Sequence, residues 1–406
     1  MAIRVFRVPL ESLPERYTVQ WNQWFPSEFE RLGFEYYEIP GASITKDVVE
    51  TGKVLDASGT MYFKFSQMQR IAELFKKGQF KNGDVFFIDD IQFPGAWAIK
   101  YMAELYKIKV YLFGYLHASS YTKEDFAEPM SPFLKSVERS WIFLYDKIFV
   151  GTNYHKNAFC NRRFPGSYRN LAKRKIHVSG APWNTWSIQN MTYKSKNHVE
   201  GKAVNRVIFP NRFDIEKRPN VFLKLADYVA NIARRKDIHF VITTSRKKLT
   251  SDPKLNDMLE TAKTVIPELT IREALTKEEY YCELSHSYLM VSTTIEENFG
   301  YCVTEALTLN TPVLVPNNYS HPEILKTCPH KDKFLYDTSW DSYKDDFDIP
   351  SLTRNWQDQR IITLGGQIIF LLHSLNLDDE LYKCVTRYNQ SIENMCEVIK
   401  EVVINA

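Results

Sequence analysis

Short runs of apolar residues recur along the chain, and segments with a helical spacing of apolar positions separate them. The runs are rich in Val, Ile, Phe and Tyr and are continuous rather than alternating, which is typical of strands buried on both faces of a parallel sheet. They cover residues 3–8, 85–89, 109–117, 147–151 and 175–180 in the first half, and 206–210, 239–244, 269–273, 288–294 and 312–316 in the second.

Helical patterns fall between these runs, over residues 97–106, 220–235, 253–263 and 301–309. Strands that alternate with helices predict an α/β fold with parallel sheets. The polar stretch 186–205 shows neither pattern, so we interpret it as a linker between two halves. We therefore expect one domain over 1–188, a second over 200–384, and a C-terminal helix over 385–406 that packs back on the first domain.

Composition agrees with a globular protein of about two domains. The chain has 406 residues, of which 44% are hydrophobic and 25% charged. The longest apolar run, over 367–375, is too short to span a bilayer, and Arg4 and Arg7 interrupt the N-terminal run that a signal peptide would need. Six cysteines without a CxxC pair predict reduced thiols and no structural zinc. We expect a cytoplasmic protein.

The stretch "TTIEENFGYCVTEALTLNTPVLVPNN", Thr293 to Asn318, is the most informative part of the sequence. It reads as the end of a buried strand followed by a helix, and Gly300 permits a close approach of the backbone to a phosphate. Glu297 precedes the turn, and Glu305 lies in the helix. Because carboxylates repel phosphates but accept hydrogen bonds from hydroxyls, the combination suggests a nucleotide-sugar site.

This stretch resembles the E-x7-E signature of family 4 retaining glycosyltransferases. "E-N-F-G-Y-C-V-T-E-A-L" is followed by "T-P-V-L-V-P" and "H-P-E-I", as in that family, and the similarity covers about 206–325. The resemblance implies a GT-B fold, in which two Rossmann-like domains face each other across a cleft. It also implies transfer of a sugar with retention from a nucleotide-sugar, with a UDP-sugar as the expected donor and no metal or other cofactor required.

The same resemblance assigns roles to individual residues. Arg212 and Lys217 would neutralise the donor diphosphate and stabilise the leaving group. Glu297 would contact the transferred sugar and Glu305 the ribose. Donor contacts are also implied for the amides near Phe299, Gly300 and Tyr301. Taken singly, Arg212 and Lys217 could instead be ordinary surface ion-pair residues, and Glu297 a helix cap.

Three residues of the first half stand at predicted strand ends. Asp89 and Asp90 could contact the acceptor or cap a loop. His117 follows the run 109–117, where the family often has a histidine near the sugar, although a lone histidine is more often structural.

Two departures from the family pattern lie at glycine positions. The segment 7–25 lacks the glycine-rich loop that usually follows the first strand. Asn310 replaces a common glycine, and asparagine tolerates the left-handed conformation of a helix C-cap.

Basic residues concentrate in 151–200, where nine lysines and arginines face a single acid, Glu200. The nine include Arg162, Arg163, Arg174, Lys175 and Lys196. Cations that alternate with aromatic residues suit a nucleic-acid surface, although a solvated surface loop would have the same charge. Bacteriophage glycosyltransferases that modify hydroxymethylated pyrimidines in DNA use GT-B folds and basic clefts. Our leading hypothesis is therefore a DNA-binding, DNA-modifying enzyme of this kind, which acts on a flipped base in double-stranded DNA.

Two other readings stay open. The acceptor could be a surface polysaccharide or a glycolipid, with the basic segment on an anionic membrane. Alternatively, the chain could be a non-catalytic module that binds a nucleotide-sugar or nucleic acid.

Overall fold

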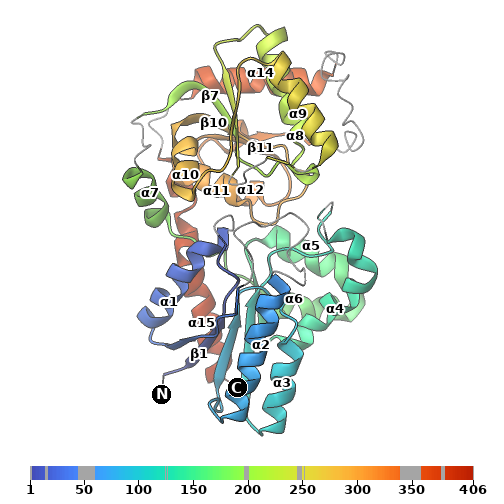
Figure 1. The fold of residues 1–406 in the computed structure, drawn as a ribbon, viewed down its shortest axis with the longest axis vertical. Helices are drawn as coiled ribbons and strands as arrows, with labels where there is room; N and C mark the ends of the chain where they lie inside the picture. Colours follow the sequence, from blue (N-terminus) through green and yellow to red (C-terminus); the bar gives the residue numbers. More distant parts are fainter. Residues whose placement is uncertain are drawn as a thin grey trace. The chain divides into compact units, whose positions relative to one another are not determined.

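The computed structural model describes residues 2–13, 17–43, 60–123, 125, 127–195, 201–244, 249–250, 252–338, 358–375 and 380–405. The chain forms two compact units (Figure 1). Unit 1 comprises 1–183 and 388–406, and unit 2 comprises 184–387.

Unit 1 is built on a six-stranded parallel sheet with the order β2-β1-β3-β4-β5-β6. Its strands are β1 (Arg4–Val8), β2 (Glu35–Glu38), β3 (Asp84–Ile88), β4 (Val110–Tyr115), β5 (Lys147–Val150) and β6 (Ile176–Val178). Its α-helices are α1 (Trp21–Arg31), α2 (Thr60–Lys76), α3 (Ala96–Leu105), α4 (Ser131–Leu144), α5 (Asn153–Arg163), α6 (Gly166–Lys175) and α15 (Ser391–Ile404). Because β3 is buried along its whole length, the sheet must be covered on both faces, as its continuous apolar runs predict.

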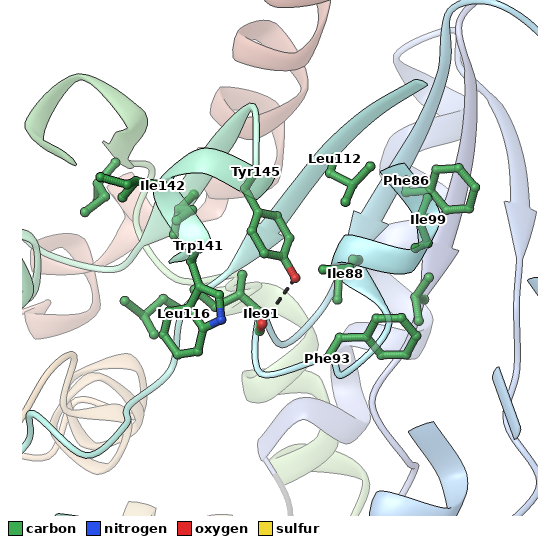
Figure 2. Packing of buried hydrophobic residues seen from close by; sticks show 14 of the residues in the cluster. Phe86, Ile88, Ile91, Phe93, Ile99, Leu112, Leu116, Trp141, Ile142 and Tyr145 are labelled. Carbon is green, nitrogen blue, oxygen red and sulfur yellow. Dashed lines mark hydrogen bonds between the residues drawn. The ribbon is translucent and has the colours of Figure 1, made fainter. Parts of the chain in front are cut away.

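The main core of unit 1 lies between the sheet and helices α2 to α6. Figure 2 shows part of it, with Phe86 and Leu112 from the sheet, Ile99 from α3 and Trp141 from α4. The Tyr145 hydroxyl at the end of α4 donates a 3.2 Å hydrogen bond to a carbonyl in the loop after β3. This contact satisfies the one polar atom of a ring that is otherwise buried among apolar side chains.

Helices α1 and α15 pack against each other although they lie at opposite ends of the chain (Figure 1). Lys400 on α15 donates to the carbonyl of Leu32 just after α1, at 2.7 Å. The C-terminal helix is therefore part of unit 1.

Unit 2 has a second six-stranded parallel sheet with the order β12-β11-β10-β7-β8-β9. Its strands are β7 (Ala203–Phe209), β8 (His239–Thr243), β9 (Leu269–Arg272), β10 (Ser287–Val291), β11 (Val313–Pro316) and β12 (Leu335–Tyr336). Its α-helices are α7 (Thr185–Lys194), α8 (Pro219–Asp227), α9 (Pro253–Val265), α10 (Lys277–His286), α11 (Tyr301–Thr308), α12 (His321–Ile324), α13 (Lys331–Phe334) and α14 (Gln359–Ser374). A π-helical turn over Tyr228–Ile232 continues α8.

Shorter 3₁₀ turns complete the two units. They cover Tyr17–Gln20, Glu128–Met130, Ile215–Lys217, Leu325–Thr327, Leu381–Cys384 and Thr386–Gln390.

The interpretation of 186–205 as a linker is wrong for most of that stretch. Residues 185–194 form α7, which the side chain of Asn184 caps by accepting from the amide of Ser187 at 2.8 Å. This helix packs against α10 and α11, and Gln189 donates to the carbonyl of Thr308 at 3.0 Å. The buried residues of this helix are Thr185, Ile188 and Thr192, whereas Trp186 and Tyr193 are exposed, so the sequence shows only a weak apolar pattern. Residues 196–200 lie outside the described part of the chain, and β7 begins at 203.

Asn310 has the left-handed conformation that the sequence predicts for it, with φ +56°. It follows α11, and its side-chain oxygen accepts from the amide of Tyr382 at 3.1 Å. The helix that carries Glu305 thus ends in an αL cap without a glycine.

Candidate functional site

The carboxyl ends of β7 and β10 form the switch point of the unit 2 sheet. The chain places β8 and β9 on one side of β7 and then returns to place β10 and β11 on the other. In open α/β sheets, ligands bind where the strand order reverses in this way. The loops after these two strands, residues 210–218 and 292–300, contain most of the residues that the sequence predicts for a donor site.

Hydrogen bonds hold these two loops together. The Thr293 hydroxyl donates to the carbonyls of Lys217 and Arg218, at 2.9 and 2.8 Å. The amide of Ile295 donates to the carbonyl of Glu216 at 3.2 Å. Because the contacts involve main-chain atoms, they fix the position of the Lys217 backbone relative to the loop that leads into α11.

Lys217 and Glu297 form an ion pair at the centre of the switch point. The Lys217 Nζ lies 2.9 Å from Glu297 Oε2, and Glu297 Oε1 accepts from the amide of Gly300 at 3.1 Å. The N-cap of α11 is Gly300 and no side chain of the described residues caps this helix, so Glu297 contacts the N-cap residue without being the cap, and it pairs with the proposed diphosphate ligand. The side chains are 13% and 21% exposed, so both can still meet a ligand.

Burial and charge compete at this pair. Burial disfavours the charged forms, but the mutual attraction outweighs it, so the pKa of Glu297 lies below and that of Lys217 above its usual value. His321, at the start of α12, is fully buried, and the charges of Glu297 and Lys217 both act on its imidazole. Burial lowers the pKa of His321 to about 4, so the imidazole is neutral at physiological pH.

Gly300 occupies the turn that starts α11. Its φ is +76°, in the left-handed region that favours glycine, and a Cβ there would lie 3.0 Å from Cδ1 of Ile324. The N-terminal turn of α11 and its dipole favour a negative charge beside this glycine.

Phe299 and Tyr301 flank the glycine, with ring centroids 4.9 Å apart in a T-shaped arrangement. Phe299 is buried and Tyr301 half-buried. Their side chains support the turn that leads into α11.

Arg212 lies on the loop after β7, with 47% of its side chain exposed. Its guanidinium forms an ion pair with Glu216 and lies 3.6 Å from Asp214. The Arg212 charge also acts on Lys217, so the structure brings the two predicted diphosphate ligands near each other.

Glu305 lies on the second turn of α11 and is only 3% exposed. Its Oε1 accepts from Lys277 Nζ at 2.6 Å and from the Tyr281 hydroxyl at 3.1 Å. Its Oε2 accepts from the Tyr280 hydroxyl at 2.8 Å. All three donors come from the first turns of α10.

Asp89 and Asp90 follow β3, at the switch point of the unit 1 sheet, and both have cationic partners. Asp89 binds Arg7 through two hydrogen bonds of 2.9 and 2.6 Å, and both side chains are buried. Asp90 lies 2.6 Å from Lys64 Nζ and accepts from the amide of Gln92 at 3.1 Å. Asp89 thus anchors β1 to β3, whereas Asp90 caps the turn after the strand.

His117 follows β4, and both of its ring nitrogens are engaged. The Nε2 atom lies 2.7 Å from the carbonyl oxygen of Asp89, which can only accept, so Nε2 carries the proton. The Nδ1 atom then accepts from the Tyr17 hydroxyl at 2.6 Å. The ring also stacks on Trp21, with centroids 5.1 Å apart, and burial lowers its pKa. These contacts are those of a structural histidine.

The predicted basic surface lies on helices rather than on a loop, and its four leading residues differ in accessibility. Arg162 and Arg174 are exposed on α5 and α6. Arg163 is buried in an ion pair with Glu138, and Lys175 donates to the carbonyl of Tyr145 at 3.1 Å. Lys196 lies outside the described residues.

Within the described ranges, no group of three or more His, Cys, Asp or Glu side chains is arranged to hold a metal ion. The six cysteines are free thiols. No helix of the described part of the chain is long and apolar enough to cross a bilayer.

Sequence reasoning missed the partners of Glu305. A capping box formed by Thr276 and Glu279 starts α10, and the pattern T-x-x-E is visible in "LTKEEYY". Positions 277, 280 and 281 follow at the i, i+3, i+4 spacing of one helix face. That spacing could have shown that they act together, but not that they face Glu305.

Comparison with known proteins supports the class that the sequence predicts. Residues 191–349 match the family model for glycosyl transferases group 1. Comparison with curated protein sequences finds none that matches.

Three solved structures share the fold along nearly the whole chain. A UDP-forming trehalose-phosphate synthase from Burkholderia xenovorans is 12% identical, with a TM-score of 0.60 and coverage of 100% of this chain and 98% of that one. The pneumococcal O-GlcNAc transferase GtfA, in complex with UDP and GlcNAc, is 10% identical, with a TM-score of 0.63 and 99% of both chains covered. A glycosyltransferase from Rickettsia africae is 13% identical, with a TM-score of 0.56 and 100% of both chains covered.

The group 1 domain contains the whole switch point of unit 2, from the loop after β7 to α12. The chain therefore has a GT-B fold, and the match of residues 191–349 to glycosyl transferases group 1 supports its assignment as a nucleotide-sugar glycosyltransferase.

Proposed function

We propose that unit 2 binds a nucleotide-sugar donor at the switch point between β7 and β10. The observation that carries the proposal is the Lys217–Glu297 ion pair beside the start of α11. It places a fixed cation, a carboxylate and a helix N-terminus together, on loops held by main-chain hydrogen bonds.

In this proposal each side chain has a separate task. Lys217 and Arg212 bind the diphosphate and stabilise the charge that develops as the sugar leaves. Glu297 accepts hydrogen bonds from hydroxyls of the transferred sugar. Glu305, on the second turn of α11, accepts from the ribose.

The reaction exchanges one bond at the anomeric carbon. The bond from that carbon to the diphosphate oxygen breaks, and a bond to the acceptor oxygen forms on the same face. The acceptor proton passes to the leaving phosphate, so the step requires no protein nucleophile and retains the configuration. The fixed cations act mainly on the leaving group, where negative charge increases.

UDP is the nucleotide that we propose. The trehalose-phosphate synthase is described as UDP-forming, and GtfA contains UDP. Both share the GT-B fold with this chain, and this shared fold supports the choice.

For the acceptor we propose a 5-hydroxymethylpyrimidine in DNA, which would make the protein a DNA-modifying enzyme of the bacteriophage type. Between residues 131 and 175 the chain has ten basic and two acidic residues, and both acids pair within the unit, Glu138 with Arg163 and Asp146 with Lys100. Exposed cations therefore dominate α5 and α6, and the exposed Tyr168 lies among them. This pattern suits phosphates and stacked bases.

The test is release of UDP from a panel of UDP-sugars, with and without duplex DNA that contains 5-hydroxymethylcytosine or 5-hydroxymethyluracil. Release that modified DNA stimulates, with a matching mass gain on the base, supports both donor and acceptor. UDP release at the same rate with and without DNA would support the donor proposal alone, and glycans and lipids would then be tested as acceptors. No release with any donor and no binding of UDP would refute the donor site.

Replacing Arg162 and Arg174 by Gln tests the basic surface separately. If each contacts a phosphate, the slope of log affinity for DNA against log salt falls by about 0.9 per residue. An unchanged slope would remove the argument for DNA. Arg31, exposed on α1, is the matched control.

A further inference from the structure

Glu305 is surrounded by hydrogen-bond donors from a single helix face. Lys277 Nζ, at 2.6 Å, and the Tyr281 hydroxyl, at 3.1 Å, reach its Oε1, and the Tyr280 hydroxyl, at 2.8 Å, reaches its Oε2. A carboxylate has about four acceptor positions. Three are occupied, and the vacant one is on Oε2.

Lys277 supplies the positive charge among these donors. Its ammonium lies 4.9 Å from the ring centroids of both Tyr280 and Tyr281, so the two rings and the carboxylate surround it. The capping box of Thr276 and Glu279 fixes the first turn of α10 and hence the origin of the Lys277 side chain. A long, flexible side chain is thus held in one place by contacts on several sides.

We propose that Lys277 is a positioning residue for nucleotide recognition, which orients Glu305 so that Oε2 accepts from one ribose hydroxyl of the donor. This inference rests on the proposed function of Glu305 as the ribose ligand. Lys277 itself does not contact the donor. It neutralises a buried carboxylate and occupies Oε1, which leaves Oε2 as the only oxygen with a free acceptor position.

The arrangement predicts that Glu305 recognises one ribose hydroxyl rather than two. A buried carboxylate that lost Lys277 would rotate or take up a proton, and either change would remove the directed acceptor. The conformation of Glu305, rather than its mere presence, would then determine how strongly the site prefers a ribonucleotide.

The experiment compares the affinities of UDP, 2′-deoxy-UDP and 3′-deoxy-UDP by calorimetry on the full chain. For the wild type, one of the two deoxy compounds should bind about tenfold more weakly than UDP, the value of one hydrogen bond to a charged group. In Lys277→Met, which keeps an unbranched side chain over the tyrosines, this ratio should fall to about one. Lys277→Arg, which keeps the charge, should restore part of it.

Two further variants separate positioning from general stability. Glu305→Gln should abolish the preference by itself, and adding Lys277→Met to it should change the ratio no further. Lys263→Met is the matched control, because Lys263 forms an exposed ion pair with Glu260 at 2.7 Å. It should leave the ratio at the wild-type value.

The outcomes distinguish the two proposals. A wild type that binds no UDP, or that binds all three compounds equally, refutes the ribose role of Glu305 and this inference with it. A wild type that prefers UDP, combined with a Lys277→Met variant that keeps the same ratio, refutes the role of Lys277 alone. A lower melting temperature with an unchanged ratio counts as that second result.

Discussion

Glu297→Gln is expected to tighten the binding of UDP while it slows sugar transfer. The change removes the negative charge that now pairs with Lys217 but keeps a side-chain oxygen that can accept from the amide of Gly300. Lys217 is then available to the diphosphate. Opposite effects on binding and turnover are unusual for a substitution in an active site, so the prediction is a strict one.

The magnitude follows from the ion pair. Two unit charges 2.9 Å apart attract by about 6 kcal/mol at an effective dielectric constant of about 20. Desolvation and the partial exposure of both side chains reduce the net value to about 1–3 kcal/mol. Transfer of half of that to the diphosphate would strengthen UDP binding by about 2- to 13-fold. Loss of the charged acceptor for a sugar hydroxyl should lower kcat/KM with a UDP-sugar by about 10- to 100-fold.

The assay pairs calorimetric titration of UDP with measurement of nucleotide release. Lys217→Met should weaken UDP binding and so move affinity in the opposite direction from Glu297→Gln. Glu260→Gln removes the carboxylate of an exposed lysine pair and should change neither quantity. Weaker or unchanged UDP binding in Glu297→Gln would refute the competition between Glu297 and the diphosphate for Lys217.

Three other predictions concern stability. Gly300→Ala should lower the free energy of unfolding by about 1–3 kcal/mol, and with it the melting temperature, because φ is +76° and the added Cβ lies 3.0 Å from a side-chain atom. The control Gly366→Ala, at an exposed position of α14, should raise the melting temperature slightly, and equal shifts for the two variants would contradict the prediction. The pKa of His321 is about 4 in the folded state and 6.5 in the unfolded state, so the unfolded state binds the extra proton, and the free energy of unfolding should fall by up to about 3 kcal/mol as pH drops from 6.5 to 4. His321→Gln should weaken this pH dependence in denaturant titrations, and an unchanged pH dependence would contradict the prediction. Arg163→Met should cost about 3–5 kcal/mol by chemical denaturation, because it leaves the fully buried carboxylate of Glu138 without a cation, and a loss under 1 kcal/mol would show that the network tolerates an uncharged residue.

The apolar runs predicted the strands well because both sheets are covered on both faces. The ten runs correspond to ten of the twelve strands found in the described residues. The two strands that were missed, β2 and β12, lie at sheet edges, and their sequences EYYE and LY are polar or very short. Edge strands need less apolar surface, so they leave a weaker pattern.

Most residues of the proposed donor site could be predicted together because they are close in the sequence. Glu297, Gly300 and Glu305 belong to one strand-turn-helix unit, whose geometry local sequence determines. Contacts between distant segments were not readable. The sequence does not show that Lys277 reaches Glu305 across 28 positions, or that Asp89 binds Arg7 across 82, because such pairs depend on tertiary packing.

The dependence on tertiary packing also explains why the partners of His117 could not be predicted from the sequence. His117 was predicted at a strand end and lies just after β4, but its partners, Tyr17 and the carbonyl of Asp89, come from other segments. Residue type and position therefore suggested chemistry, and only the structure shows that both ring nitrogens are already engaged.

The most direct test of the central claim is UDP release from a panel of UDP-sugars by the wild type and by Lys217→Met. The account predicts turnover of at least one donor by the wild type, with kcat/KM reduced about 100-fold or more in the variant, since a fixed cation that stabilises a leaving diphosphate contributes about 3 kcal/mol. Equal rates for the two proteins would contradict the assignment of the donor site to the switch point of unit 2.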